Sequence, residues 1–128
     1  MNDLNDIERK ARMLMTAHGV GSLDFAFDRG TRRIAALHMA KYNSATGPVN
    51  LAKKITFSRK WALVLPEQDV WEVMIHEIAH ALTCNARTPH GPEFAAVVRR
   101  LGGKATKRCF SPSVNIDGTP RKVVCILS

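Results

Sequence analysis

The sequence is poor in cysteine, and its few cysteines stand far apart. Cys84, Cys109 and Cys125 are the three in 128 residues, and no two of them have the close spacing of a zinc-binding pair or a disulfide framework. Long hydrophobic runs are missing as well, since no apolar stretch approaches the length of about 20 residues that a helix needs to cross a bilayer. Residues 1–6 show no basic, apolar leader. We therefore expect a cytoplasmic protein with no membrane span and no disulfides.

Acidic residues are the second shortage. Eleven Asp and Glu stand against nineteen Lys and Arg, which gives a net charge of +8. Most of the excess lies from residue 99 onward, where Asp117 is the single acid. The basic residues of this segment are Arg99, Arg100, Lys104, Lys107, Arg108, Arg121 and Lys122. Such a surface attracts phosphate backbones without reading their sequence, which makes DNA a candidate partner. A merely solvated surface is the alternative interpretation.

The pattern of apolar residues predicts one α+β domain. A chain of 128 residues is long enough to bury about two thirds of its unfolded surface. Apolar residues at helical spacing predict helices, and alternating ones predict strands. The predicted helices are residues 5–18, 66–83 and 92–101. The predicted strands are residues 23–27, 32–41 and 54–58. A turn at 28–30 leads into the returning strand, and 42–48 is predicted as loop. The resulting fold is an N-terminal helix, a small, mostly antiparallel sheet and two helices that flank a metal site.

The central predicted helix carries two histidines four residues apart, His76 and His80. On an α-helix this spacing places both imidazoles on one face, one turn apart, where they can share a metal ion. Glu77 projects beside them and can reach a water bound to that ion. This is the H-E-x-x-H arrangement of two zinc ligands and a general base. Two hydrogen-bonded core histidines and a surface glutamate are the alternative, which the cost of burying unpaired ionisable groups disfavours.

A catalytic zinc site needs a third protein ligand and leaves a fourth position open. His90 is the predicted third ligand, because it follows His80 after a connector that can fold the chain back. Cys84 is a competitor, but it stands eight residues after His76, a span of about 12 Å along a helix. Ligands of one zinc cannot lie that far apart. Glu93 is a second competitor, and it is also explained as a first-turn acid of the following helix.

Two short segments together resemble a known family. His-Glu-Ile-Ala-His-Ala-Leu at residues 76–82, followed by His-Gly-Pro-Glu-Phe at 90–94, is similar to the SprT-like zinc metalloprotease domain. The resemblance extends over about residues 55–102. It implies a zincin-like minimal protease core, with zinc ligands at His76, His80 and His90 and the catalytic acid/base at Glu77. The family includes a protease of DNA–protein crosslinks.

The C-terminal segment departs from that family. Many SprT-like proteins carry a cysteine-rich zinc ribbon after the protease core, and such a ribbon needs about four Cys or His ligands. Residues 104–128 contain two cysteines and no histidine. We therefore expect a protease core over residues 1–103 and a basic extension over 104–128 without a zinc ribbon. The extension is predicted to hold strands at 106–110 and 122–127 around a turn at Asp117-Gly118.

The resemblance implies a zinc-dependent endopeptidase that uses metal-activated water, with Glu77 moving the proton. Together with the basic surface it implies DNA-associated proteins or DNA–protein crosslinks as substrates. Two other hypotheses stay open: a nucleic-acid-binding module with a structural zinc, and a zinc hydrolase of a non-protein substrate. Glu72, four residues before His76, is a candidate for the carboxylate that orients a ligand histidine, or else a surface residue.

Overall fold

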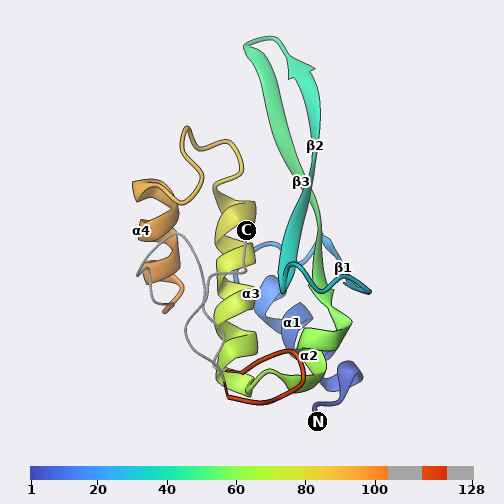
Figure 1. Ribbon diagram of the computed structural model, residues 1–128. Coiled ribbons are helices and arrows are strands. Elements are labelled where there is room, and N and C mark those ends of the chain that lie inside the picture. The colour runs from blue at the N-terminus through green and yellow to red at the C-terminus, as the bar shows by residue number, and fades with distance from the viewer. Residues whose placement is uncertain (104–113, 121–128) are drawn as a thin grey trace.

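The predicted helices and strands follow the chain in the expected order, and the structure adds a short helix at residues 59–64 that the sequence pattern does not predict. The computed structural model describes residues 1–103 and 114–120 (Figure 1). Its elements are α1 (Leu4–Ala17), β1 (Asp24–Asp28), β2 (Ala35–Ser44), β3 (Gly47–Ser58), α2 (Arg59–Val64), α3 (Glu67–Leu82) and α4 (Pro92–Arg100). The predicted α+β class is confirmed, and so are the N-terminal helix, the central helix and the helix that follows it.

The described strands form a mixed sheet in the order β1-β3-β2. β2 pairs with β3 antiparallel along a long ladder, whereas β1 pairs with the last residues of β3 in parallel. The returning strand is therefore present, but β3 lies between it and β1. The connection explains this order. The Gly30 carbonyl accepts a hydrogen bond from the Ser58 hydroxyl (2.6 Å) and the Thr31 carbonyl accepts one from the Trp61 indole (3.1 Å), so the chain crosses the end of β3.

β2 and β3 form a long hairpin that extends beyond the helices (Figure 1). The prediction of a loop over residues 42–48 is wrong, since β2 continues to Ser44 and β3 begins at Gly47, whose φ of 120° suits a tight turn. The segment misled the prediction because it is rich in Asn, Ser, Gly and Pro, which favour turns. A register shift between His38 and Met39 interrupts the ladder, and such irregularities increase the twist of a hairpin.

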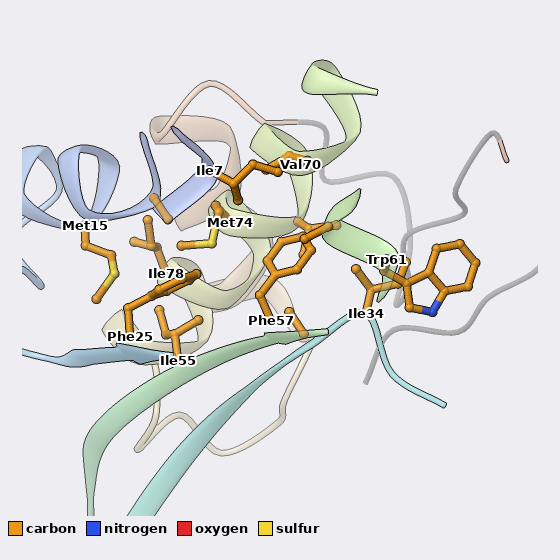
Figure 2. Packing of buried hydrophobic residues seen from close by; sticks show 14 of the residues in the cluster. Ile7, Met15, Phe25, Ile34, Ile55, Phe57, Trp61, Val70, Met74 and Ile78 are labelled. Carbon is orange, nitrogen blue, oxygen red and sulfur yellow. The ribbon is translucent and has the colours of Figure 1, made fainter. Parts of the chain in front are cut away.

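The main core lies between the sheet and the helices α1 and α3. Figure 2 shows side chains of α1 (Ile7, Met15), of the strands (Phe25, Ile55, Phe57) and of α3 (Met74, Ile78) packed together. Every residue of α3 from 73 to 79 is buried. Pro66 precedes the helix, two acids occupy its first turn, and Thr83 ends it, which are the expected signals for its bounds. α3 is therefore held on several sides and forms a rigid base for the side chains that it carries.

A second, smaller cluster joins α3 to α4. Ile75 and Ala79 of α3 pack against Phe94 and Val98 of α4. α4 begins directly after Gly91 with Pro92 in its first turn, as the sequence predicts. The segment between α3 and α4 must therefore reverse the chain within a few residues, and it carries the third predicted ligand.

The C-terminal predictions fall largely outside the described residues. A turn around Gly118, whose φ is 90°, is closed by a bridge between Val114 and Pro120, so the predicted turn is confirmed. The predicted strands at 106–110 and 122–127 lie outside the described part of the chain, as do the basic residues Lys104, Lys107, Arg108, Arg121 and Lys122. Arg99 and Arg100 are exposed in the last turn of α4. No described helix combines the length and apolarity that crossing a membrane requires.

Candidate metal centre and catalytic site

Three histidines bring one ring nitrogen each to a common point. Nε2 of His80 lies 3.0 Å from Nε2 of His76 and 2.9 Å from Nε2 of His90. Nε2 of His76 and Nε2 of His90 are 3.3 Å apart. Among the described residues, these three side chains form a group that could hold a metal ion. The structure thus brings together the three residues that the sequence indicates.

α3 and α4 fix the rings of this group. His76, 8% exposed, and His80 stand one turn apart on the rigid helix α3. The Phe94 ring of α4 lies against all three imidazoles, with centroid distances of 5.0 Å to His76, 4.6 Å to His80 and 5.1 Å to His90. The sequence predicts Phe94 only as part of the apolar face of its helix. The sequence feature that could have predicted this packing is the position of Phe94, four residues after His90.

His90 reaches the site from a strained position in the loop. Its φ is 60°, in the left-handed region that non-glycine residues rarely adopt. The following Gly91 is also constrained, because a Cβ there would lie 3.0 Å from the Cβ and the carbonyl oxygen of Thr88. The Gly91 N–H donates to the Thr88 carbonyl (3.1 Å). Strain of this kind persists only where the surroundings impose it, and it is common at functional sites.

The chemistry of the three nitrogens fits a metal ion. Each Nε2 either carries a proton or presents a lone pair, so at least two of three adjacent Nε2 atoms must be alike. Two protons or two lone pairs that face each other repel, and hydrogen bonds within the group cannot satisfy all three. Three nitrogens bound at about 2.0–2.1 Å to a tetrahedral zinc lie about 3.3 Å apart, close to the 2.9–3.3 Å observed. Imidazole also suits zinc and other late transition metals.

Glu77 lies on the same helix and is 1% exposed. The backbone of Leu37, on β2, interacts with its carboxylate. Its Oε2 atom has no hydrogen-bond partner among the described residues. Burial raises the pKa of Glu77 to about 8, and the positive charge of Arg33 and the backbone of Leu37 offset only part of that rise. A buried carboxylate with one open oxygen costs folding free energy, which is typical of a group retained for its chemistry.

A pocket of about 220 Å³ opens beside this carboxylate. β2 forms one wall, and the other comes from α3 and the loop that follows it. The residues that line it are Leu37, Met39, Glu77, His80, Thr83, Cys84, Ala86, Pro89 and His90. A molecule in this pocket therefore contacts the carboxylate and two of the three histidines at once.

The other candidates from the sequence stand outside the histidine group. The Cys84 thiol donates a weak hydrogen bond to the Asn50 carbonyl (3.7 Å), and Glu93 is exposed in the first turn of α4. Neither belongs to the group of potential metal ligands found among the described residues. Glu72 accepts a hydrogen bond from Gln68 (3.3 Å) in an exposed pair. This contact favours the interpretation of Glu72 as a surface residue.

Comparison with known proteins gives one match. A family model described as the SprT-like family matches residues 21–117. The matched range includes the whole described sheet, α3, α4, the three histidines and Glu77. No curated protein and no solved structure matches the chain.

Proposed function

The chain belongs to the SprT-like family, and from this premise we propose that it is a zinc-dependent endopeptidase. His76, His80 and His90 would hold the ion, and Glu77 would act as the catalytic acid and base. One observation carries the proposal: a buried carboxylate with an open oxygen lines the same pocket as two of the three convergent histidines. A purely structural zinc site has no need of such a carboxylate.

The proton chemistry follows from the surroundings of Glu77. Zinc, when bound, supplies a Lewis acid that polarises a substrate carbonyl and acidifies a water molecule. Glu77 accepts the proton of the attacking water at Oε2 and delivers it to the leaving amine. The backbone of Leu37, which interacts with the carboxylate, would help to keep it in place during both transfers. The raised pKa of Glu77 belongs to the metal-free chain; a zinc ion beside the carboxylate would lower that pKa and keep Glu77 ionised, as a general base must be.

The edge of the sheet offers a place for the substrate backbone. β2 is an edge strand of the described sheet, and the backbone of its Leu37 interacts with Glu77. Leu37 and Met39 of this strand line the pocket. An extended peptide that pairs with an edge strand gains backbone hydrogen bonds independent of its sequence. Pairing along β2 would bring a peptide carbonyl to the pocket, which favours an endopeptidase with broad sequence tolerance.

Charge supports DNA-associated proteins or DNA–protein crosslinks as the substrate class. Between residues 29 and 66 the chain has no acidic residue. The basic residues of this stretch, which forms β2, β3 and α2, are Arg29, Arg32, Arg33, Lys41, Lys53, Lys54, Arg59 and Lys60. All except the half-buried Lys54 are exposed. A basic surface on the sheet that forms one wall of the pocket would keep a phosphate backbone, and any protein attached to it, near the catalytic residues.

The test incubates the zinc-loaded chain with a histone, with and without single-stranded DNA, beside Glu77→Gln. We expect DNA-stimulated cleavage that falls by about 10²–10⁴-fold in the variant, because glutamine cannot transfer the proton. Glu93→Gln makes the same chemical change at an exposed site and should cleave normally.

Any other outcome of this test would change one part of the proposal. Glu77-dependent cleavage that ignores DNA would keep the endopeptidase and reject the DNA-associated substrate class. Salt-sensitive DNA binding without cleavage, in a chain that unfolds on chelation, would favour a binding module with structural zinc. Glu77-dependent hydrolysis of a non-protein ester alone would favour a different zinc hydrolase.

A further inference from the structure

Two asparagines join the hairpin to the loop that carries His90. The Asn50 backbone N–H donates to Oδ1 of Asn85 (2.7 Å), and Nδ2 of Asn85 donates to the Asn50 carbonyl (2.9 Å). The Asn50 side chain in turn donates from Nδ2 to the Cys84 carbonyl (2.9 Å). We call these three hydrogen bonds the asparagine clasp. It links β3 to residues that come directly after the end of α3.

The clasp occupies an open edge of β3. β1 pairs with β3 only at residues 54–58, so within the described chain the stretch 47–53 has β2 as its single neighbour. The Asn85 side chain presents one acceptor and one donor to the N–H and C=O of Asn50, as a neighbouring strand would. A side chain that reproduces a strand contact fixes both distance and orientation, because an amide offers its two groups in one plane.

The clasp lies between the two halves of the site. Asn85 follows Cys84, which lines the pocket together with Met39 of β2, and it precedes His90 by five residues. The loop between them is closed on itself by local turns, with hydrogen bonds from Ala86 N–H to the Thr83 carbonyl (2.9 Å) and from Gly91 N–H to the Thr88 carbonyl (3.1 Å). These turns reduce the freedom of the loop, so its attachment at one end helps to set the position of His90, together with the contact of Phe94 at the other end.

We propose that Asn50 and Asn85 are positioning residues that hold the His90 loop against the hairpin. The clasp keeps Nε2 of His90 within reach of His76 and His80, and it closes the pocket between Met39 and Cys84. Any partner that moves the hairpin would also act on the third ligand through this contact. The inference rests on the proposed function in one respect, since it takes the three histidines to be metal ligands.

The test compares Asn85→Ala, Asn50→Ala and Asn43→Ala in the full chain. Asn85→Ala removes two bonds of the clasp, Asn50→Ala removes only the bond to the Cys84 carbonyl, and Asn43 is an exposed residue of the same hairpin. Zinc affinity is measured by competition with a chelator, and the cobalt(II) absorption spectrum reports ligand geometry. Hydrogen exchange of the metal-free chain reports whether the loop after α3 is held.

We expect a graded loss. Asn85→Ala should weaken zinc binding by about 5–10-fold, at or below the lower end of the 10–100-fold typical of direct partners of a ligand, and should alter the cobalt spectrum. It should also speed amide exchange in the loop without metal. Asn50→Ala should show a smaller change of the same kind, and Asn43→Ala none.

Unchanged zinc affinity, cobalt spectrum and loop exchange in Asn85→Ala would overturn the inference. Equal losses in Asn85→Ala and Asn43→Ala would also overturn it, because they would show a general effect of altering the surface. If Asn85→Ala does not fold, Asn50→Ala decides, since it keeps the backbone groups of the clasp. Failure of the wild-type chain to bind zinc would instead contradict the proposed function.

Discussion

The site is made of two regions with opposite physical characters, helix α3 and the loop of residues 83–91. α3 is buried along its middle, and its periodicity alone places His76, Glu77 and His80 together. The loop is mostly half-buried or exposed, and it delivers His90 through a positive φ. The helix needs no special contact to present its donors. The loop depends on Gly91, on local turns and on its attachment to the hairpin, so the third donor is the adjustable part of the site.

The largest effect should come from removing one metal donor on α3 and, in a separate variant, the donor in the loop. His76→Ala and His90→Ala should both abolish stoichiometric zinc binding, because two imidazoles do not complete a site that needs three protein ligands. The variants should differ in the metal-free state. His76→Ala leaves space in the buried middle of α3 and should lower the free energy of unfolding by roughly 1–3 kcal/mol. His90→Ala should change it by less than about 1 kcal/mol, as expected for a half-buried loop position.

Zinc content by atomic absorption and chemical denaturation check this contrast. Equal destabilisation by the two substitutions would show that the loop is as integral to the fold as the helix. Zinc retained at one equivalent in His90→Ala would remove His90 from the ligand set.

The next largest effect is the pH dependence of stability that Glu77, on α3, should cause. The pKa of Glu77 is raised from its ordinary 4.5 to about 8, mainly by burial. Below pH 4.5 the carboxyl is protonated in both folded and unfolded chains, so it carries no penalty. Between pH 4.5 and about 8 the unfolded chain loses the proton while the folded chain keeps it, so stability falls as pH rises. The metal-free chain should lose roughly 2–5 kcal/mol across this window.

Glu77→Gln provides the control for this pH dependence. Glutamine does not titrate, so the variant should lack this fall and should be more stable than the wild type above neutral pH. Thermal unfolding of both metal-free chains across the window measures the difference. A wild-type stability that rises with pH relative to the variant would contradict the expected direction.

The smallest expected effect on zinc binding comes from two substitutions that separate it from stability. Ile78→Ala empties part of the core under α3 and should cost about 2–5 kcal/mol of stability, with little change in zinc affinity. Gly91→Ala adds a Cβ that meets Thr88 at 3.0 Å; it should cost about 1 kcal/mol and yet weaken zinc binding several-fold. Denaturation and chelator competition on both variants test the contrast. Zinc affinity that follows stability in both would mean that helix and loop contribute in the same way.

The same contrast explains what the sequence alone predicts. α3 follows a proline and has two acids in its first turn, a continuous apolar surface and two histidines at helical spacing, so its bounds and its part of the site follow from local rules. His90 could be predicted as the third donor from its place after a short connector. The clasp between Asn50 and Asn85 could not, because it depends on a contact between residues 35 positions apart.

The sheet shows the same limit. The strand at residues 23–27 could be recognised by its alternation, and β1 occupies nearly that range. Its partner could not, because the order β1-β3-β2 is set by hydrogen bonds from Ser58 and Trp61 to the crossing segment. The end of the β2–β3 hairpin could not be recognised, because no core packs against it to impose an alternating apolar pattern on its residues. Tertiary contacts decide these features, and composition does not reveal them.

X-ray absorption spectroscopy of the zinc-loaded chain is the most direct test of the metal site. We expect one zinc with three imidazole nitrogens and a further light-atom ligand, all at about 2.0–2.1 Å, and no sulfur. A sulfur ligand at about 2.3 Å would contradict this ligand set. Such a ligand would mean that a cysteine takes the place of a histidine, and that His90 is not the third donor.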